Sequence, residues 1–198
     1  MSKAPGLSRR DILNSLLLPA LGLGLASAPS NVFAQASGNS RTLVAYLSRS
    51  GNTRVIAGQL QRRFRADLFE IRTAEPYPED YEETVERARQ HRDSAATPPL
   101  AESVGDVAGY QTVFLGFPIW GMALPAPVRT FLTTHDLSDK TLVPFITHGG
   151  YGTGSAPRSV ADLASGARIL EPFVLQADQE RETLNRVTAW LQAVEPEL

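Results

Sequence analysis

The chain has 198 residues and a mass of 21.5 kDa, which is enough for one domain or at most two. It carries 19 Lys and Arg against 21 Asp and Glu, and a net charge of −2 gives no strong attraction to nucleic acid or anionic lipid. The absence of cysteine excludes disulfides, iron–sulfur clusters, thiolate zinc sites and a cysteine nucleophile. With 42% hydrophobic and 20% charged residues the composition is that of a soluble globular protein, so function must be inferred from local motifs.

The N-terminal 34 residues are predicted to be an export signal. Their apolar stretch, residues 16–26, is interrupted by Pro19 and is shorter than the ~20 residues that a membrane span needs. Arg9 and Arg10 precede it within Ser8-Arg9-Arg10-Asp11-Ile12-Leu13, a run that resembles a twin-arginine signal. A general secretory signal with a chance arginine pair, or a short membrane anchor, is the alternative.

We expect cleavage after Ala34, with Ala36 as the alternative position. A linker over residues 35–40 then leads into one domain, residues 41–198, and the protein is predicted to be periplasmic. Removal of residues 1–34 leaves 16 basic and 20 acidic residues, a net charge of −4. Weak, salt-sensitive docking to basic partner proteins is the corresponding expectation, without stable membrane insertion.

Five apolar runs predict five strands. The first, third and fourth are uninterrupted, as in strands buried on both faces of a parallel sheet, whereas the second and fifth carry polar groups typical of edge strands. The runs are residues 43–47, 68–71, 113–115, 142–146 and 169–175. Pro144 lies inside the fourth run, where its missing N–H predicts a local irregularity.

Helical patterns lie between the runs. Ile56, Leu60 and Phe64 have helical spacing after the first run. The last helix is marked by Leu184, Val187, Leu191 and Val194, with Asp178 as its N-cap. Because parallel neighbours need crossover helices, the sequence predicts a three-layer, doubly wound α/β fold whose five-stranded parallel sheet has the order 2-1-3-4-5.

The carboxyl ends of strands one, three and four, where strand order reverses, are the expected binding region of such a sheet. The first strand is followed by Ser48, Arg49, Ser50, Gly51, Asn52 and Thr53, which lead directly into a helix. Hydroxyls, a glycine and free amides at a helix N-terminus suit a phosphate dianion. A simple helix cap with Ser and Asn turn chemistry is the alternative.

Three segments together resemble the flavodoxin family over about residues 41–195. They are Ser48–Thr53, the segment Gly116-Phe117-Pro118-Ile119-Trp120-Gly121 and the segment Thr147-His148-Gly149-Gly150-Tyr151-Gly152. They match, in order and spacing, the family's FMN phosphate loop and its two isoalloxazine loops. The resemblance implies that the chain binds FMN.

The resemblance also implies a role for each loop. Pro118, Ile119 and Trp120 would pack the flavin ring, and Gly121 would take the place of the residue whose backbone flips near N5. The glycine-rich third loop would bring backbone amides to the pyrimidine edge, and Tyr151 would cover the outer ring face. His148 is either a pH-sensitive electrostatic partner or a plain hydrogen-bonding residue.

FMN is expected to be held non-covalently. The segment Ser165-Gly166-Ala167-Arg168 resembles sites of covalent FMN attachment, but Arg168 stands where the acceptor hydroxyl would be. Gly166 is instead expected to end the fourth helix in a left-handed conformation. His91 and His135 are expected to be solvated residues away from the site, and the lack of His and carboxylate clusters predicts no metal.

Three functions remain open. The first is an exported electron carrier that passes electrons between protein partners through FMN. The second is an FMN enzyme that reduces quinones or other small acceptors, and the third is a flavin-binding protein without redox turnover. No separate nucleotide fingerprint for NAD(P)H is present.

Overall fold

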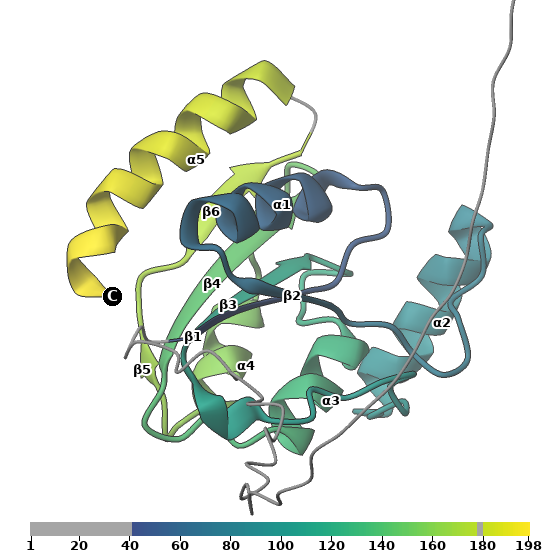
Figure 1. Ribbon diagram of the computed structural model, residues 1–198. Helices are drawn as coiled ribbons and strands as arrows, with labels where there is room; N and C mark the ends of the chain where they lie inside the picture. Colours follow the sequence, from purple (N-terminus) through teal and green to yellow (C-terminus); the bar gives the residue numbers. More distant parts are fainter. Residues whose placement is uncertain (1–40, 178–179) are drawn as a thin grey trace, which may run out of the picture. The chain divides into compact units, whose positions relative to one another are not determined.

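The strands of the described residues, 41–177 and 180–198 in the computed structural model, form one parallel sheet (Figure 1). Its order is β2-β1-β3-β4-β5, with β6 also paired to β4, so the predicted order is confirmed and only the fifth strand differs, being split in two. The strands are β1 (Arg41–Tyr46), β2 (Asp67–Glu70), β3 (Tyr110–Pro118), β4 (Thr141–His148), β5 (Arg168–Ile169) and β6 (Phe173–Gln176).

The split in the fifth strand lies opposite Pro144. Because β4 pairs Leu142 with Ile169 but Phe145 with Phe173, three residues of the β5–β6 segment face two residues of β4. The register between β3 and β4 is unbroken across Pro144. The irregularity predicted at the proline is therefore a bulge in the neighbouring edge segment, where the loss of one ladder bond disturbs the sheet least.

Helices cover both faces of the sheet. In Figure 1, α1 and α5 lie over one face and α3 and α4 over the other, while α2 lies outside these layers. The helices are α1 (Asn52–Phe64), α2 (Tyr81–Asp93), α3 (Ala126–Thr134), α4 (Ala156–Leu163) and α5 (Glu180–Val194), with short 3₁₀ helices at Val107–Gly109 and Glu195–Glu197. No helix of the described residues is long and apolar enough to cross a membrane.

Because successive side chains of each strand point to opposite faces of the sheet, the core consists of two clusters. Leu43 and Leu115 belong to the cluster under α3 and α4, whereas Val44 and Phe114 belong to the cluster under α1 and α5. Gly116 makes room in the second cluster, since a Cβ there would lie 2.1 Å from the Phe145 ring.

Two expectations about the helices are wrong, and others are not tested by the described residues. Leu184 is 44% exposed rather than part of the buried face of α5, which includes Val187 and Leu191. The α4 helix ends at Leu163, so Gly166 does not cap it, and Gly166 instead lies against Ser138 without a left-handed φ. The predicted N-cap Asp178 and the predicted signal lie outside the described residues.

His135 is buried rather than solvated. Its ring stacks on Phe131, and its Nε2 accepts a hydrogen bond of 3.1 Å from the N–H of Val104. This contact ties the loop before β3 to the end of α3.

Candidate functional site

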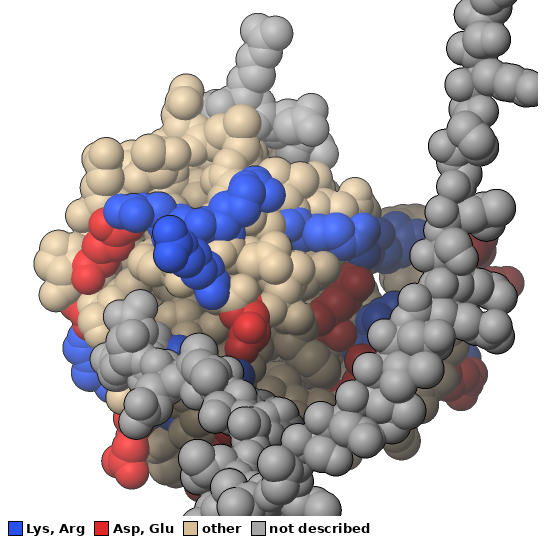
Figure 2. Space-filling view, viewed as in Figure 1, with Lys and Arg blue, Asp and Glu red and all other residues tan. Residues whose placement is uncertain are grey.

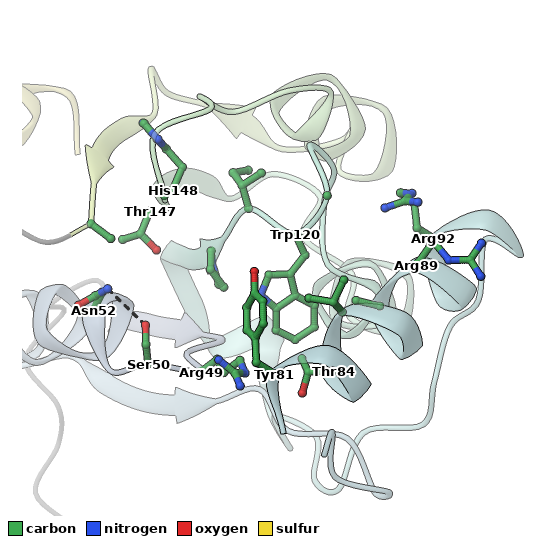
Figure 3. Close-up of a pocket in the computed structure, with 17 residues that line it drawn as sticks. Arg49, Ser50, Asn52, Tyr81, Thr84, Arg89, Arg92, Trp120, Thr147 and His148 are labelled. Atoms are coloured by element: carbon green, nitrogen blue, oxygen red, sulfur yellow. Dashed lines mark hydrogen bonds between the residues drawn. The ribbon is translucent and has the colours of Figure 1, made fainter. Parts of the chain in front are cut away.

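A cavity of about 360 Å³ lies at the carboxyl ends of β1, β3 and β4 (Figure 3). Its walls are the loops that follow these strands, one residue after β6, and one side of α2. The lining residues are Arg49, Ser50, Asn52, Tyr81, Thr84, Val85, Ala88, Arg89, Arg92, Pro118, Ile119, Trp120, Gly121, Thr147, His148, Gly149 and Ala177. The volume lies in the range of small-molecule sites.

The loop after β1 presents an open helix N-terminus. Gly51 is the N-cap of α1 with a φ of 95°, it has no side chain to cap the helix, and the first turn has no acidic residue. Among the described residues the amides of Asn52 and Thr53 have no acceptor. A Cβ on Gly51 would meet no atom within 4 Å, so the space beside these amides is open. Free amides at the positive end of a helix dipole form an anion site.

Side-chain hydrogen bonds fix this loop. The Oγ of Ser48 accepts from the N–H of Arg54 at 3.3 Å, and Nδ2 of Asn52 donates to the Oγ of Ser50 at 3.3 Å. Beneath the loop, the buried hydroxyls of Thr53 and Thr147 are 2.9 Å apart. This last bond joins the first turn of α1 to the end of β4, so two walls of the cavity are held together.

Of the described residues, three arginines and no carboxylate line the cavity. Arg89 and Arg92 form ion pairs on α2 with Glu86 and Asp93. Arg49 has no carboxylate partner among the described residues: its guanidinium donates to the carbonyl of Glu79 at 3.1 Å and lies 5.3 Å from the Tyr81 ring centre. The Arg49 guanidinium therefore lies on the α2 side of the cavity, beside the start of that helix.

A tight hairpin turn presents Trp120 to the cavity. Trp120 and Ala123 exchange backbone hydrogen bonds of 3.3 and 3.2 Å, and the two residues between them, Gly121 and Met122, have φ values of 55° and 62°. Two consecutive positive φ angles are the requirement of a type I′ turn. The turn is anchored to β4 because the N–H of Ile119 donates to the carbonyl of Thr147 at 2.8 Å.

The loop after β4 is organised around His148. Its Nδ1 accepts hydrogen bonds from the amides of Gly150 and Gly152 at 3.0 and 3.3 Å, so the structure gives this histidine the hydrogen-bonding role. Those amides therefore point to the imidazole rather than into the cavity. Tyr151, at the tip of the loop, is 86% exposed and does not line the cavity.

Most of the predicted site residues come together. Those that line the cavity are Arg49, Ser50, Asn52, Pro118, Ile119, Trp120, Gly121, Thr147, His148 and Gly149. The others shape the same loops from outside its lining: Ser48, Gly51, Thr53, Gly150, Tyr151 and Gly152.

Sequence reasoning missed the wall formed by α2. Tyr81, Val85, Ala88 and Arg92 recur at helical spacing and face the cavity. Tyr81 is 61% and Val85 43% exposed, so apolar surface faces the open cavity, as expected of a ligand site. A sequence signal for the helix exists: Asp80 accepts from the N–H of Glu83 at 3.0 Å, the Asp-x-x-Glu arrangement of a helix start.

The fold and the site define a doubly wound α/β protein that has a helix N-terminus with free amides and an aromatic loop at the switch point of its sheet. The flavodoxin family model matches residues 41–194, and the chain belongs to the flavodoxin family. No curated protein matches it significantly in sequence.

Solved structures agree with this assignment. The chain is 27% identical to a proposed flavoprotein from Bacteroides uniformis, with a TM-score of 0.67 over 77% of this chain and 98% of that one. A proposed flavoprotein from Bacteroides eggerthii is 29% identical, with a TM-score of 0.67 over 79% and 99%. A flavoprotein from Lactobacillus acidophilus, solved in complex with FMN, shares the fold at 20% identity and a TM-score of 0.61 over 74% and 99%.

Proposed function

We propose that this chain is an electron-transfer flavoprotein that holds FMN non-covalently in the cavity. The observation that carries the proposal is the difference between the two ends of the site: one end is a helix N-terminus with free amides, and the other end is walled by Trp120 together with Tyr81 and Val85 of α2. FMN has two matching ends, since a phosphate dianion is joined to a flat aromatic ring.

Each wall of the cavity contacts a different part of FMN in this proposal. The free amides at the start of α1 bind the phosphate. Trp120, Ile119 and Val85 exclude water from the ring, and Trp120 offers a flat aromatic surface at low entropic cost. Gly149 leaves its backbone open to the ring's polar edge, because a Cβ there would meet nothing within 4 Å. When bound, FMN supplies reversible uptake of one or two electrons.

The carrier function is tested by a redox titration that counts the electrons taken up in each step. The protein as purified should show the absorption of an oxidised flavin, which is released on denaturation, and it should exchange electrons in one-electron steps with chemical mediators. Reduction only in two-electron steps by NAD(P)H would favour an enzyme. Bound flavin that cannot be reduced and reoxidised would leave a binding protein without redox turnover.

The carrier is proposed to act in the periplasm after export of the folded, FMN-loaded protein. The support is Arg9-Arg10 and the apolar stretch behind it, since a twin-arginine signal exports folded proteins and FMN is made in the cytoplasm. Replacing Arg9 and Arg10 by Lys should retain the protein in the cytoplasm. Continued export of FMN-loaded protein by that variant would contradict the proposal.

A second cavity favours a second candidate function, the reduction of a small acceptor. It measures about 470 Å³, shares Arg49 and Trp120 with the first cavity, and is lined by apolar residues such as Leu47 and Ile71 and by three further charged residues, Glu70, Arg72 and Glu102. A quinone, which has an apolar ring and two carbonyl oxygens, fits this mixed lining. Ala101→Trp, which fills the second cavity, should then slow quinone reduction without loss of FMN. Unchanged quinone reduction in that variant would exclude the second cavity as the acceptor site.

A further inference from the structure

Behind the cavity wall, three side chains of different chemistry form a row. Trp120 packs edge-on against Tyr77, with ring centres 4.9 Å apart and planes at 64°. The hydroxyl of Tyr77 lies 2.7 Å from Nδ1 of His91 on α2. An indole that lines the cavity is thus in contact with a phenol, and the phenol is hydrogen-bonded to an imidazole.

The surroundings of Tyr77 keep its hydroxyl protonated. They also disfavour loss of an electron from the ring unless the phenolic proton is lost with it. Burial raises the pKa of Tyr77 to about 12, so the hydroxyl keeps its proton at neutral pH. The Arg87 guanidinium lies 5.8 Å from the centre of the Tyr77 ring, and this positive charge disfavours a cationic phenol. Loss of an electron from Tyr77 must therefore be accompanied by loss of the phenolic proton, and His91 is the base within reach.

We propose that Trp120, Tyr77 and His91 form a one-electron hole-transfer site that removes oxidising equivalents from the wall of the cavity. The oxidant is a one-electron oxidant acting on Trp120. In the cofactor-bound protein this is photoexcited flavin, and only that assignment rests on the proposed function. The chain has no cysteine, so no thiol competes as the group that is oxidised.

The step balances in electrons and protons. One electron passes from the Tyr77 phenol to the Trp120 indole radical cation and restores the neutral indole. The O–H bond of Tyr77 breaks, and its proton forms an N–H bond at Nδ1 of His91. The products are a Tyr77 phenoxyl radical and a His91 imidazolium, so the positive charge has moved from Trp120 to His91. Return of one electron to Tyr77 and of the proton from His91 restores the starting state.

The other tryptophan, Trp190, has no tyrosine or histidine ring in contact within the described part of the chain, so it can be removed in the experiment. Trp190 packs against Phe173 and Phe114, which donate no electron under these conditions. Tyr110, at the opposite end of β3 from Trp120, donates its hydroxyl to Asp67 and lies under the Arg41 guanidinium. Among the described residues, Tyr77 is the tyrosine with both an indole and an imidazole in contact.

The experiment uses the full chain freed of flavin, with Trp190→Phe so that Trp120 is the only tryptophan. Azide radicals generated by pulse radiolysis oxidise the indole, and the indole and phenoxyl radicals are followed by their absorption. We expect the indole signal to decay as the phenoxyl signal rises. Tyr77→Phe should slow that decay by about tenfold or more, equivalent to ~1.4 kcal/mol in the barrier. Tyr110→Phe should leave it unchanged, and an unchanged decay in Tyr77→Phe would overturn the proposal.

The role of His91 has its own readout. His91→Gln keeps a hydrogen-bond acceptor beside Tyr77 but not a base. The decay of the indole signal should therefore slow, as it does in Tyr77→Phe, and the phenoxyl signal should rise more slowly. Transfer in the protein with Tyr77 and His91 intact should also slow in D₂O, an effect that a merely structural contact does not produce. Neither effect appearing would overturn the proton transfer to His91. Because no flavin is present, failure here is distinct from a failure to bind FMN.

Discussion

Gly154 is the residue at which the loop after β4 touches the turn after β3. Its φ is 54°, and a Cβ there would lie 2.0 Å from the carbonyl oxygen of Met122. The same carbonyl accepts a 3.0 Å hydrogen bond from the N–H of Ser155. Two cavity walls therefore depend on a residue without a side chain.

Gly154→Ala is expected to lower the unfolding free energy by roughly 1–3 kcal/mol, because the left-handed φ and the clash with Met122 must both be accommodated. Urea denaturation measures the change. Gly105→Ala is the matched control, since Gly105 has no left-handed φ and a Cβ there would meet nothing within 4 Å. Equal stability of the two variants would show that the loops do not depend on this contact.

At the scale of residues, the sequence predicts which residues reach the site better than it predicts the direction in which their groups point. Trp120 and Asn52 were predicted to reach the site because they follow buried strands, and both line the cavity. The orientation of the Gly150 and Gly152 amides toward His148 could not be predicted, because it depends on a hydrogen bond formed within the folded loop. The left-handed φ of Met122 likewise arises from the turn and not from its residue type.

Among the elements, α2 is the one whose contribution to the cavity wall was not predicted from the sequence. Thr84 is its one buried residue, so the helix lacks the apolar stripe by which periodicity detects a packed helix. Of its cavity-facing residues, the two large apolar ones, Tyr81 and Val85, are exposed. The strands, by contrast, were predicted from their apolar runs because the sheet buries them on both faces.

Val85→Glu tests the role of α2 in the cavity. A carboxylate there would be desolvated by a bound ring, so we expect FMN affinity to fall by about tenfold or more, or ~1.4 kcal/mol. Gln90→Glu adds the same group to an exposed position of α2 outside the cavity lining and should bind FMN normally. Fluorescence titration of the full chain with FMN measures both variants. Equal affinities would remove α2 from the site.

The amino ends of three strands meet at Asp67. This carboxylate of β2 accepts from the hydroxyl of Tyr110 on β3 at 2.7 Å and from the guanidinium of Arg41 on β1 at 2.9 Å. The Tyr110 hydrogen bond, and then that of Arg41, lower the pKa of Asp67. A lowered folded-state pKa stabilises the fold above the unfolded value of about 3.9, and this stabilisation is lost as pH falls through the folded value.

Asp67→Asn is therefore expected to reduce stability at neutral pH and to have progressively less effect below about pH 4. The reduction should be at most about 1 kcal/mol, because the carboxylate is 57% exposed and solvent screens its interactions. Urea denaturation of both proteins across this pH range measures the difference. A difference that stays constant into strong acid would assign the effect to packing rather than to charge.

In the molecule as a whole, charge is distributed unevenly. Residues 41–72 contain seven arginines and two carboxylates, whereas residues 73–106 contain three arginines and nine carboxylates. Figure 2 shows a row of basic side chains across the face that carries α1. The net charge alone therefore does not predict where on the surface a charged partner would dock.

The architecture of the whole molecule was the most predictable level. Strand order follows from which apolar runs carry polar interruptions, and the binding edge follows from that order. Only local deviations, such as the bulge opposite Pro144, required the structure.

The most direct test of the cofactor assignment compares FMN with riboflavin, which has the same ring but no phosphate. Titrations of the flavin-free full chain should give tight binding of FMN and binding of riboflavin weaker by about tenfold or more, or ~1.4 kcal/mol. The difference is expected because the free amides of Asn52 and Thr53 are placed to receive the phosphate. Equal affinity for the two flavins, or no binding of FMN, would contradict the account.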